Sequence, residues 1–93
     1  MIVYLSIGNS DDKLTQREWS EFYVRIAAEV ASLASTIHGA WLSHPAVPWQ
    51  NACWCLEFSN GAAEEAREVA TEIRREYKQD SVAWAEVPVT DFI

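Results

Sequence analysis

The chain has 93 residues, of which 49% are hydrophobic and five are tryptophan, so it is long enough for one domain and too apolar to be disordered. Seven basic residues stand against fourteen acidic ones, and the net charge of −7 repels phosphate backbones. This balance argues against ordinary nucleic-acid binding, and it fits either a soluble protein or one whose partner is basic.

The sequence predicts one cytoplasmic domain that covers residues 1–93. Its first apolar run, residues 1–7, has no basic leader and is too short for a signal peptide or a membrane span. Cys53 and Cys55 are the only cysteines, and two residues apart on a strand they lie near the upper distance limit for a disulfide. We therefore expect reduced thiols and a reducing compartment.

The first half of the chain predicts a strand and a long helix. Residues 2–7 are β-branched and aromatic with period-two alternation, which is typical of a strand with one apolar face. Thr15 and Glu18 have the spacing of a capping box. The apolar stripe that follows keeps helical spacing as far as Ile37, so we expect the helix to end at Gly39.

The second half predicts, in order, a strand at 40–43, a proline-bearing loop, a strand at 52–58, a helix at 62–78 and a strand at 82–87. Acidic residues begin the second helix and basic residues end it, as the helix dipole favours. Pro88 makes residues 88–93 a C-terminal tail or an edge extension.

The order β-α-β-β-α-β predicts an α+β, ferredoxin-like fold. Two right-handed β-α-β crossovers interleave into a four-stranded antiparallel sheet of order 4-1-3-2, with two helices on one face. Because this fold supports many functions, the fold alone does not assign one.

The topology brings three connections to one end of the sheet and so predicts a polar recognition site there, with Trp49 as its anchor. The alternative is that the prolines and Trp49 close the end of the core while the polar residues satisfy turns. Asp80 is expected nearby. The residues of this predicted loop-end site are Asn9, Ser10, Asp11, Asp12, His44, Trp49, Gln50 and Asn51.

The helix-free face of the sheet is the second candidate. An uncovered apolar face usually marks an interaction surface, and we expect a second copy to cover it, with the C-terminal tail reaching across. One alternative is that the tail folds back over its own sheet. Another is that the aromatic side chains stack on RNA bases, although the basic residues that usually surround such a surface are missing. The residues of this predicted interface are Tyr4, Trp41, Cys53, Cys55, Trp84 and Phe92.

No pattern in the sequence predicts a catalytic residue, a cofactor or a metal. Structural zinc sites use wider cysteine spacing and four ligands, whereas Cys53, Cys55 and His44 supply three. A nucleophilic cysteine needs an adjacent base, and neither histidine is clearly aimed at one. Asp11 and Asp12 are consecutive carboxylates at a helix entry, which are common.

The opening VYLSIGNSDDKLTQ and the later PWQNACWC resemble small uncharacterised proteins of actinobacteria and their phages. That resemblance implies a cytoplasmic accessory protein, carried by a mobile element, that occupies a host protein. The chain is also similar to CRISPR adaptation subunits in running from its first strand into Asp11 and Asp12. The aspartate that these subunits carry at the end of the strand would fall at Gly8 or Asn9, so the resemblance does not imply that this chain is a nuclease.

Dimeric α+β barrel proteins, which include cofactor-free monooxygenases and haem-degrading enzymes, resemble the chain in length and in a C-terminal extension. Some place an Asn, a Trp and a His around a cavity, and Asn9, Trp49 and His44 have these residue types without an aligned motif. Because no catalytic pattern is present, the charge is acidic and one sheet face is uncovered, we expect a non-enzymatic, acidic, homodimeric interaction module. The alternative is a dimeric α+β barrel that binds or oxidises a small aromatic or amphipathic ligand.

Overall fold

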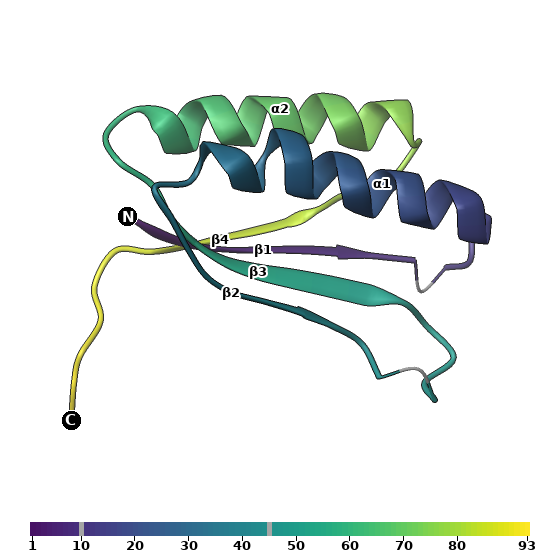
Figure 1. Ribbon diagram of the computed structural model, residues 1–93, viewed down its shortest axis with the longest axis horizontal. Helices are drawn as coiled ribbons and strands as arrows, with labels where there is room; N and C mark the ends of the chain where they lie inside the picture. Colours follow the sequence, from purple (N-terminus) through teal and green to yellow (C-terminus); the bar gives the residue numbers. More distant parts are fainter. Residues whose placement is uncertain (10, 45) are drawn as a thin grey trace.

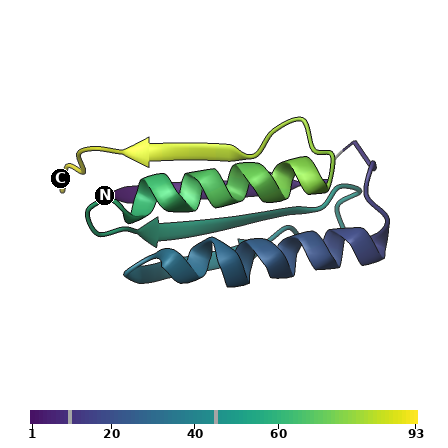
Figure 2. The ribbon, with the colours of Figure 1, turned by 90° about the horizontal axis from the view of Figure 1, so that it is seen from above.

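The expected ferredoxin-like fold is confirmed. The computed structural model describes residues 1–9, 11–44 and 46–93. In chain order the elements are β1 (Ile2–Gly8), α1 (Gln16–Glu29), the 3-10 turn η1 (Ala31–Leu33), β2 (Thr36–Leu42), β3 (Asn51–Glu57), α2 (Ala62–Glu76) and β4 (Ala83–Val87). The sheet has the order β2-β3-β1-β4 with antiparallel neighbours, and both helices lie on one side of it (Figures 1 and 2).

The core lies between the helices and the two central strands. Alternate side chains of β1 and β3 point toward the helices, and each large one contributes roughly 1.5–3 kcal/mol when buried. Aromatic rings fill much of this layer: Tyr23 stacks on Trp54, and Phe22 stacks on Tyr77, each with ring centroids 5.2 Å apart. The largest fully buried side chains are Phe22, Leu5, Ile26, Leu56, Ile73, Val3 and Val30.

The predicted capping box begins α1. The Thr15 hydroxyl accepts from the Glu18 amide at 3.2 Å, and the Glu18 carboxylate accepts from the Thr15 amide at 3.0 Å. The bonds from Thr15 lower the pKa of Glu18 below its usual value. Leu14, which precedes the cap, is buried and closes the core at this end.

The prediction that the first helix continues to Ile37 is wrong. After Val30 the chain tightens into η1, and Ala34 is already extended at φ −71° and ψ 145°. Thr36 begins β2, and Ile37 pairs with Leu56 on β3. Apolar residues at three- and four-residue spacing fit either element locally, so the pairing with β3 decides.

The other boundaries agree closely with the sequence. The strand expected at 40–43 begins earlier, at Thr36, because the helix before it is shorter. The remaining strands and α2 shift by at most two residues at either end, which is the normal uncertainty of element boundaries.

Trp84 does not lie on the helix-free face, so its predicted orientation is wrong. It pairs with Leu5, whose side chain is fully buried under the helices, and paired residues share a face. Its ring stacks on that of Phe58 with centroids 5.9 Å apart, at the edge of the core. The heavier alternation set of β4 therefore faces the helices, as it does in β3.

We expect Trp84→Lys to destabilise the fold. The substitution removes a half-buried ring and its contact with Phe58, so the free energy of unfolding should fall by roughly 2 kcal/mol in urea denaturation. Val89→Lys, beyond the strand at a side chain 73% exposed, should change it by less than about 0.5 kcal/mol. Equal effects of the two substitutions would contradict the observed placement of Trp84.

Candidate functional site

Three connections meet at one end of the sheet, as the topology predicts. The β1–α1, β2–β3 and α2–β4 connections all lie at the end where α1 begins (Figure 1). The Asn9 amide donates to the Gln50 carbonyl at 2.8 Å, which joins the first two connections. The Lys13 ammonium lies 2.9 Å from the Asp80 carboxylate and joins the first to the third.

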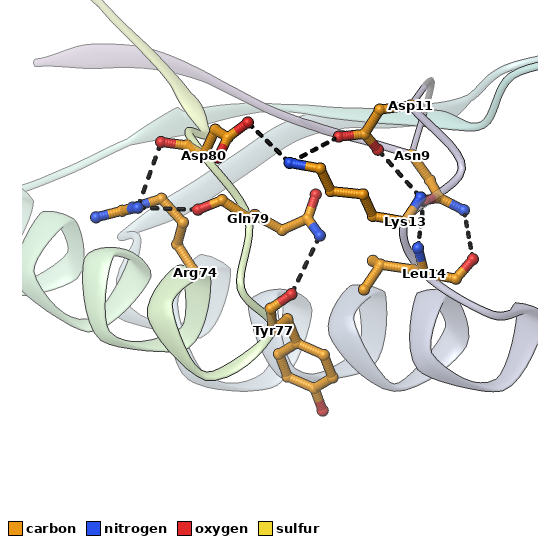
Figure 3. A network of polar contacts seen from close by, with 8 residues as sticks. All are labelled: Asn9, Asp11, Lys13, Leu14, Arg74, Tyr77, Gln79 and Asp80. Atoms are coloured by element: carbon orange, nitrogen blue, oxygen red, sulfur yellow. Dashed lines mark hydrogen bonds and ion pairs between the residues drawn. The ribbon is translucent and has the colours of Figure 1, made fainter.

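Asn9 holds the β1–α1 connection from inside. Its side chain is 3% exposed and bonds Leu14 twice: the amide donates to the Leu14 carbonyl at 3.1 Å, and the side-chain oxygen accepts from the Leu14 amide at 3.0 Å (Figure 3). The same amide also donates to the Gln50 side chain at 3.1 Å. Asn9 is therefore a structural residue of the loop and not a free recognition group.

Gln50 is engaged as well. Its side-chain amide donates to the side-chain oxygen of Gln16 at 2.9 Å, and its own side-chain oxygen accepts from the side-chain amide of Gln16 at 3.2 Å. The reciprocal pair joins the β2–β3 connection to the first turn of α1. Like Asn9, Gln50 forms its side-chain hydrogen bonds with other residues of the fold.

Lys13 lies between two carboxylates on the surface of this end. Its ammonium is 2.9 Å from Asp80 and 3.6 Å from Asp11 (Figure 3). The hydrogen bond that Lys13 donates to Asp80 raises the pKa of Lys13, and the same bond lowers the pKa of Asp80. Beneath them, the Arg74 guanidinium donates to the Gln79 carbonyl at 2.9 Å and holds the α2–β4 turn.

The predicted loop-end site is divided between two shallow hollows. A polar one of about 320 Å³ is lined by Ser6, Ile7, Gly8, Asp11, Asn51, Gln79, Asp80, Ser81 and Ala83. A second one, of mixed polarity and about 310 Å³, is lined by Trp19, Leu42, Ser43, His44, Val47, Trp49, Gln50 and Asn51. Asp11 thus belongs to one hollow, and His44 and Trp49 belong to the other.

Trp49 does not close the core. Its side chain is 48% exposed, while Trp19 and Leu14 are buried at this end instead. His44 accepts from the Ala46 amide at 3.0 Å and shapes the local turn. Asp12 has a left-handed backbone with φ 59°, and its side chain is exposed. Ser10 lies outside the described residues.

The helix-free face of the sheet carries most of the predicted interface. Strand pairing places Tyr4 opposite Cys55, and Cys53 opposite both Ser6 and Trp41. Tyr4 and Trp41 are 40% and 52% exposed. The Cys55 thiol lies beside the phenol of Tyr4 and raises the pKa of that phenol. The same register adds four residues that the sequence analysis missed: Ile2, Ala83, Ala85 and Val87.

The C-terminal tail leaves the end of β4 and extends away on the helix-free side of the sheet (Figure 1). Val89, Phe92 and Ile93 are 73%, 95% and 120% exposed. The tail therefore does not cover its own sheet in this structure.

The polar chemistry on the helix-free face is sparse. Cys53 and Cys55 are free thiols, both half-buried. His38 lies 2.8 Å from the Glu57 carboxylate at the corner of the sheet. In residues 1–9, 11–44 and 46–93, no three side chains of metal-binding type gather. Within the same ranges, no helix is long and apolar enough to cross a membrane.

A charge pattern in the sequence marks one side of the molecule. Between Glu29 and Glu57 the sequence contains no Asp, Glu, Lys or Arg. That stretch includes β2, the β2–β3 connection and nearly all of β3. Because interface cores are depleted of charge, this pattern could have identified the β2 side of the sheet from the sequence.

Comparisons with family models, with curated proteins and with solved structures give no match to this chain.

We expect Asn9→Ala to destabilise the protein through the two bonds with Leu14. The substitution leaves a buried backbone amide and carbonyl without their partner, which costs roughly 2–3 kcal/mol in urea denaturation. Asn60→Ala, in an exposed turn, is the matched control and should be nearly neutral. An effect of Asn9→Ala as small as that of the control would show that Asn9 does not hold the loop.

The Asp80 carboxyl should titrate below its usual pKa of 3.8 in the folded protein. Because the folded pKa is the lower one, the pair stabilises the fold above the usual pKa, and this contribution is lost as pH falls through the folded value. NMR titration should show the Asp80 pKa rising toward the usual value in Lys13→Met and unchanged in Lys78→Met. An unchanged Asp80 pKa in Lys13→Met would contradict the pairing.

Proposed function

We propose that this chain is a non-enzymatic protein-interaction module that forms a homodimer through the helix-free face of its sheet. The observation that carries the proposal is the uncovered surface of that face from Trp41 on β2 to Val87 on β4, which is mainly apolar, contains Ser6 and is bordered by Glu57. Exposed apolar surface of this extent usually marks an interaction site.

The size of the face sets the strength that we expect. Four strands spaced about 4.8 Å apart, each rising about 3.3 Å per residue, give a face of roughly 20 by 20 Å. Two such faces give roughly 800 Å² in total, below the roughly 1,200 Å² at which stable protein interfaces begin, so we expect weak association in the micromolar range. The exposed Phe92 of the tail, reaching across the partner's face, adds apolar area.

A ligand-binding α+β barrel is the second candidate, and the interior of the molecule does not favour it. Such a barrel needs space between the helices and the sheet. Phe22, Trp54 and Phe58 are 1–3% exposed and occupy this layer. A titration of the tryptophan fluorescence with small aromatic and amphipathic ligands tests this alternative, and saturable micromolar binding would support it.

The partner beyond a second copy is proposed from charge. A net charge of −7 attracts a basic protein surface. At the loop end, the exposed side chains of Trp49 and His44 offer contacts that would anchor such a partner. Together with the resemblance to actinobacterial and phage proteins, this extends the proposal to a cytoplasmic accessory protein of a mobile element that acts on a host protein.

We expect Tyr4→Lys to weaken the homodimer while the protomer stays folded. Tyr4 is exposed in the middle of the face, so a lysine there places like charges between the two copies. Sedimentation or native mass spectrometry should show the wild type above its protomer mass of 10.5 kDa and the variant at a lower mass than the wild type. Circular dichroism reports whether the fold is retained.

Val24→Lys makes the same change in charge on α1, at a side chain 56% exposed, away from the sheet face. It should leave the association constant unchanged. A wild type that is monomeric at tens of micromolar, or equal effects of the two lysines, would overturn the sheet-face dimer.

A further inference from the structure

The strand β2 is attached to the rest of the fold along one edge only. It pairs with β3 on one side and forms the border of the sheet on the other. Ile37 and Leu42 pair with buried residues of β3 and so lie on the helix side, yet they remain 52% and 59% exposed. Trp41, on the opposite side of the strand, is 52% exposed.

The hydrogen bonds between β2 and β3 show which backbone groups of β2 point away from β3. Ser43 donates to the Asn51 carbonyl at 2.8 Å, so Ser43 and Asn51 form a bonded pair. Bonded and non-bonded pairs alternate along an antiparallel ladder, so the backbone of Trp41 bonds that of Cys53. The backbone amides and carbonyls of Ala40 and Leu42 point away from β3, and we call these positions outward. The outward groups are two amides and two carbonyls on a strand without charge.

The β1–β3 ladder supports the same alternation. The Asn9 amide donates to Gln50 at 2.8 Å, and the Phe58 amide donates to Met1 at 2.9 Å. The odd-numbered residues of β1 therefore bond β3, and the even-numbered residues bond β4. It follows that on β4 the outward positions are Trp84, Glu86 and then Pro88.

The two edges of the sheet are thus protected differently. On β4, Pro88 has no amide to offer, and Glu86 places a charge 3.7 Å from Arg67 beside the edge. On β2, the outward positions are Ala40 and Leu42, and the nearest charged residues in sequence are Glu29 and Glu57. Lysines, glutamates and prolines are the usual means of blocking an edge, and β2 has none.

We propose that β2 pairs with β2 of a second copy in antiparallel register, so that two sheets join edge to edge. The two-fold axis passes beside Trp41: Ala40 of each copy exchanges amide and carbonyl bonds with Leu42 of the other. Trp41 then lies opposite its own counterpart as a non-bonded pair, where cross-strand side chains are closest. The bulge between Ile37 and Gly39 lies outside the paired stretch.

Charge selects a second copy as the occupant. Two chains of −7 repel each other, and the repulsion is smallest where the charge-free side of one meets the charge-free side of the other. A basic partner gains no attraction from this edge. An isologous pair also needs only one apolar uncharged strand, because the same strand supplies both halves.

This edge pairing goes beyond the sheet-face dimer and uses different atoms, so the two are tested separately. In a Tyr4→Lys background, which blocks the face, the chain should still form an edge dimer of twice the protomer mass. Adding Ala40→Pro removes one outward amide without touching the β3 ladder, and should return the chain to a monomer. Adding Ala40→Val keeps the amide and should keep the dimer.

Glu86→Pro in the same background is the matched control, because it removes an outward amide from the other edge. It should leave the edge dimer intact. Ala40→Pro alone should still associate through the face. If it does while Tyr4→Lys is monomeric, the edge proposal fails and the face proposal stands; if Tyr4→Lys associates as well as the wild type, the face proposal fails.

Amide exchange gives a second readout that does not depend on a proline variant folding. With increasing concentration of the Tyr4→Lys protein, the Ala40 and Leu42 amides should become protected, while the Trp84 and Glu86 amides should not. Fast exchange at Ala40 and Leu42 at every concentration would overturn the pairing of two copies and would leave the edge to a strand of another protein.

Covalent trapping tests the register. In a Tyr4→Lys, Cys53→Ser, Cys55→Ser background, in which the face is blocked, Trp41→Cys places two thiols at a non-bonded pair, whose Cα separation of about 4.5 Å suits a disulfide. Mild oxidation should give a covalent dimer on a non-reducing gel. Ala85→Cys, at the opposite edge, should stay monomeric, and equal trapping of both would overturn the proposed register.

Discussion

The structure depends on one constraint: two helices cover only one face of a four-stranded sheet. The buried sides of β1 and β3 meet α1 and α2 and supply the core, and the aromatic stacking of Tyr23 on Trp54 closes this layer. The other face receives no such cover from the described residues, and the tail extends away from it. The proposed interactions of the molecule follow from what this arrangement leaves exposed.

The loop end illustrates how a cluster of polar residues can be structural. Asn9 and Gln50 were expected to recognise a partner, and both have residue types that do so. In the fold, Asn9 satisfies the backbone of Leu14, and Gln50 joins Asn9 to Gln16. What remains available is the exposed pair of Trp49 and His44, which line the hollow of mixed polarity and not the one that contains the acidic residues.

Charge and edge strands connect the two proposed modes of self-association. A chain with an excess of acidic residues is repelled least by a copy of itself where the two surfaces carry few of them. The β2 edge carries none, the helix-free face carries Glu57 at its corner, and the two surfaces share Trp41. The β4 edge differs, because Pro88 has no amide to offer at an outward position and Glu86 places a charge beside the edge.

Local sequence determined the element order, the capping box at Thr15, the core alternation of β1 and β3, and from these the fold. These features depend on neighbours within a few residues or on a period that repeats. The side of the sheet on which Trp84 lies did not follow from local sequence. Alternation within a five-residue strand separates two sets of side chains, and only the pairing of β4 with β1 decides which set faces the helices. Likewise, Ile37 fits a helix by spacing and becomes a strand residue only through Leu56. Tertiary pairing also decided that Asn9 is buried and that the β2 edge is open, because both depend on residues distant in the chain.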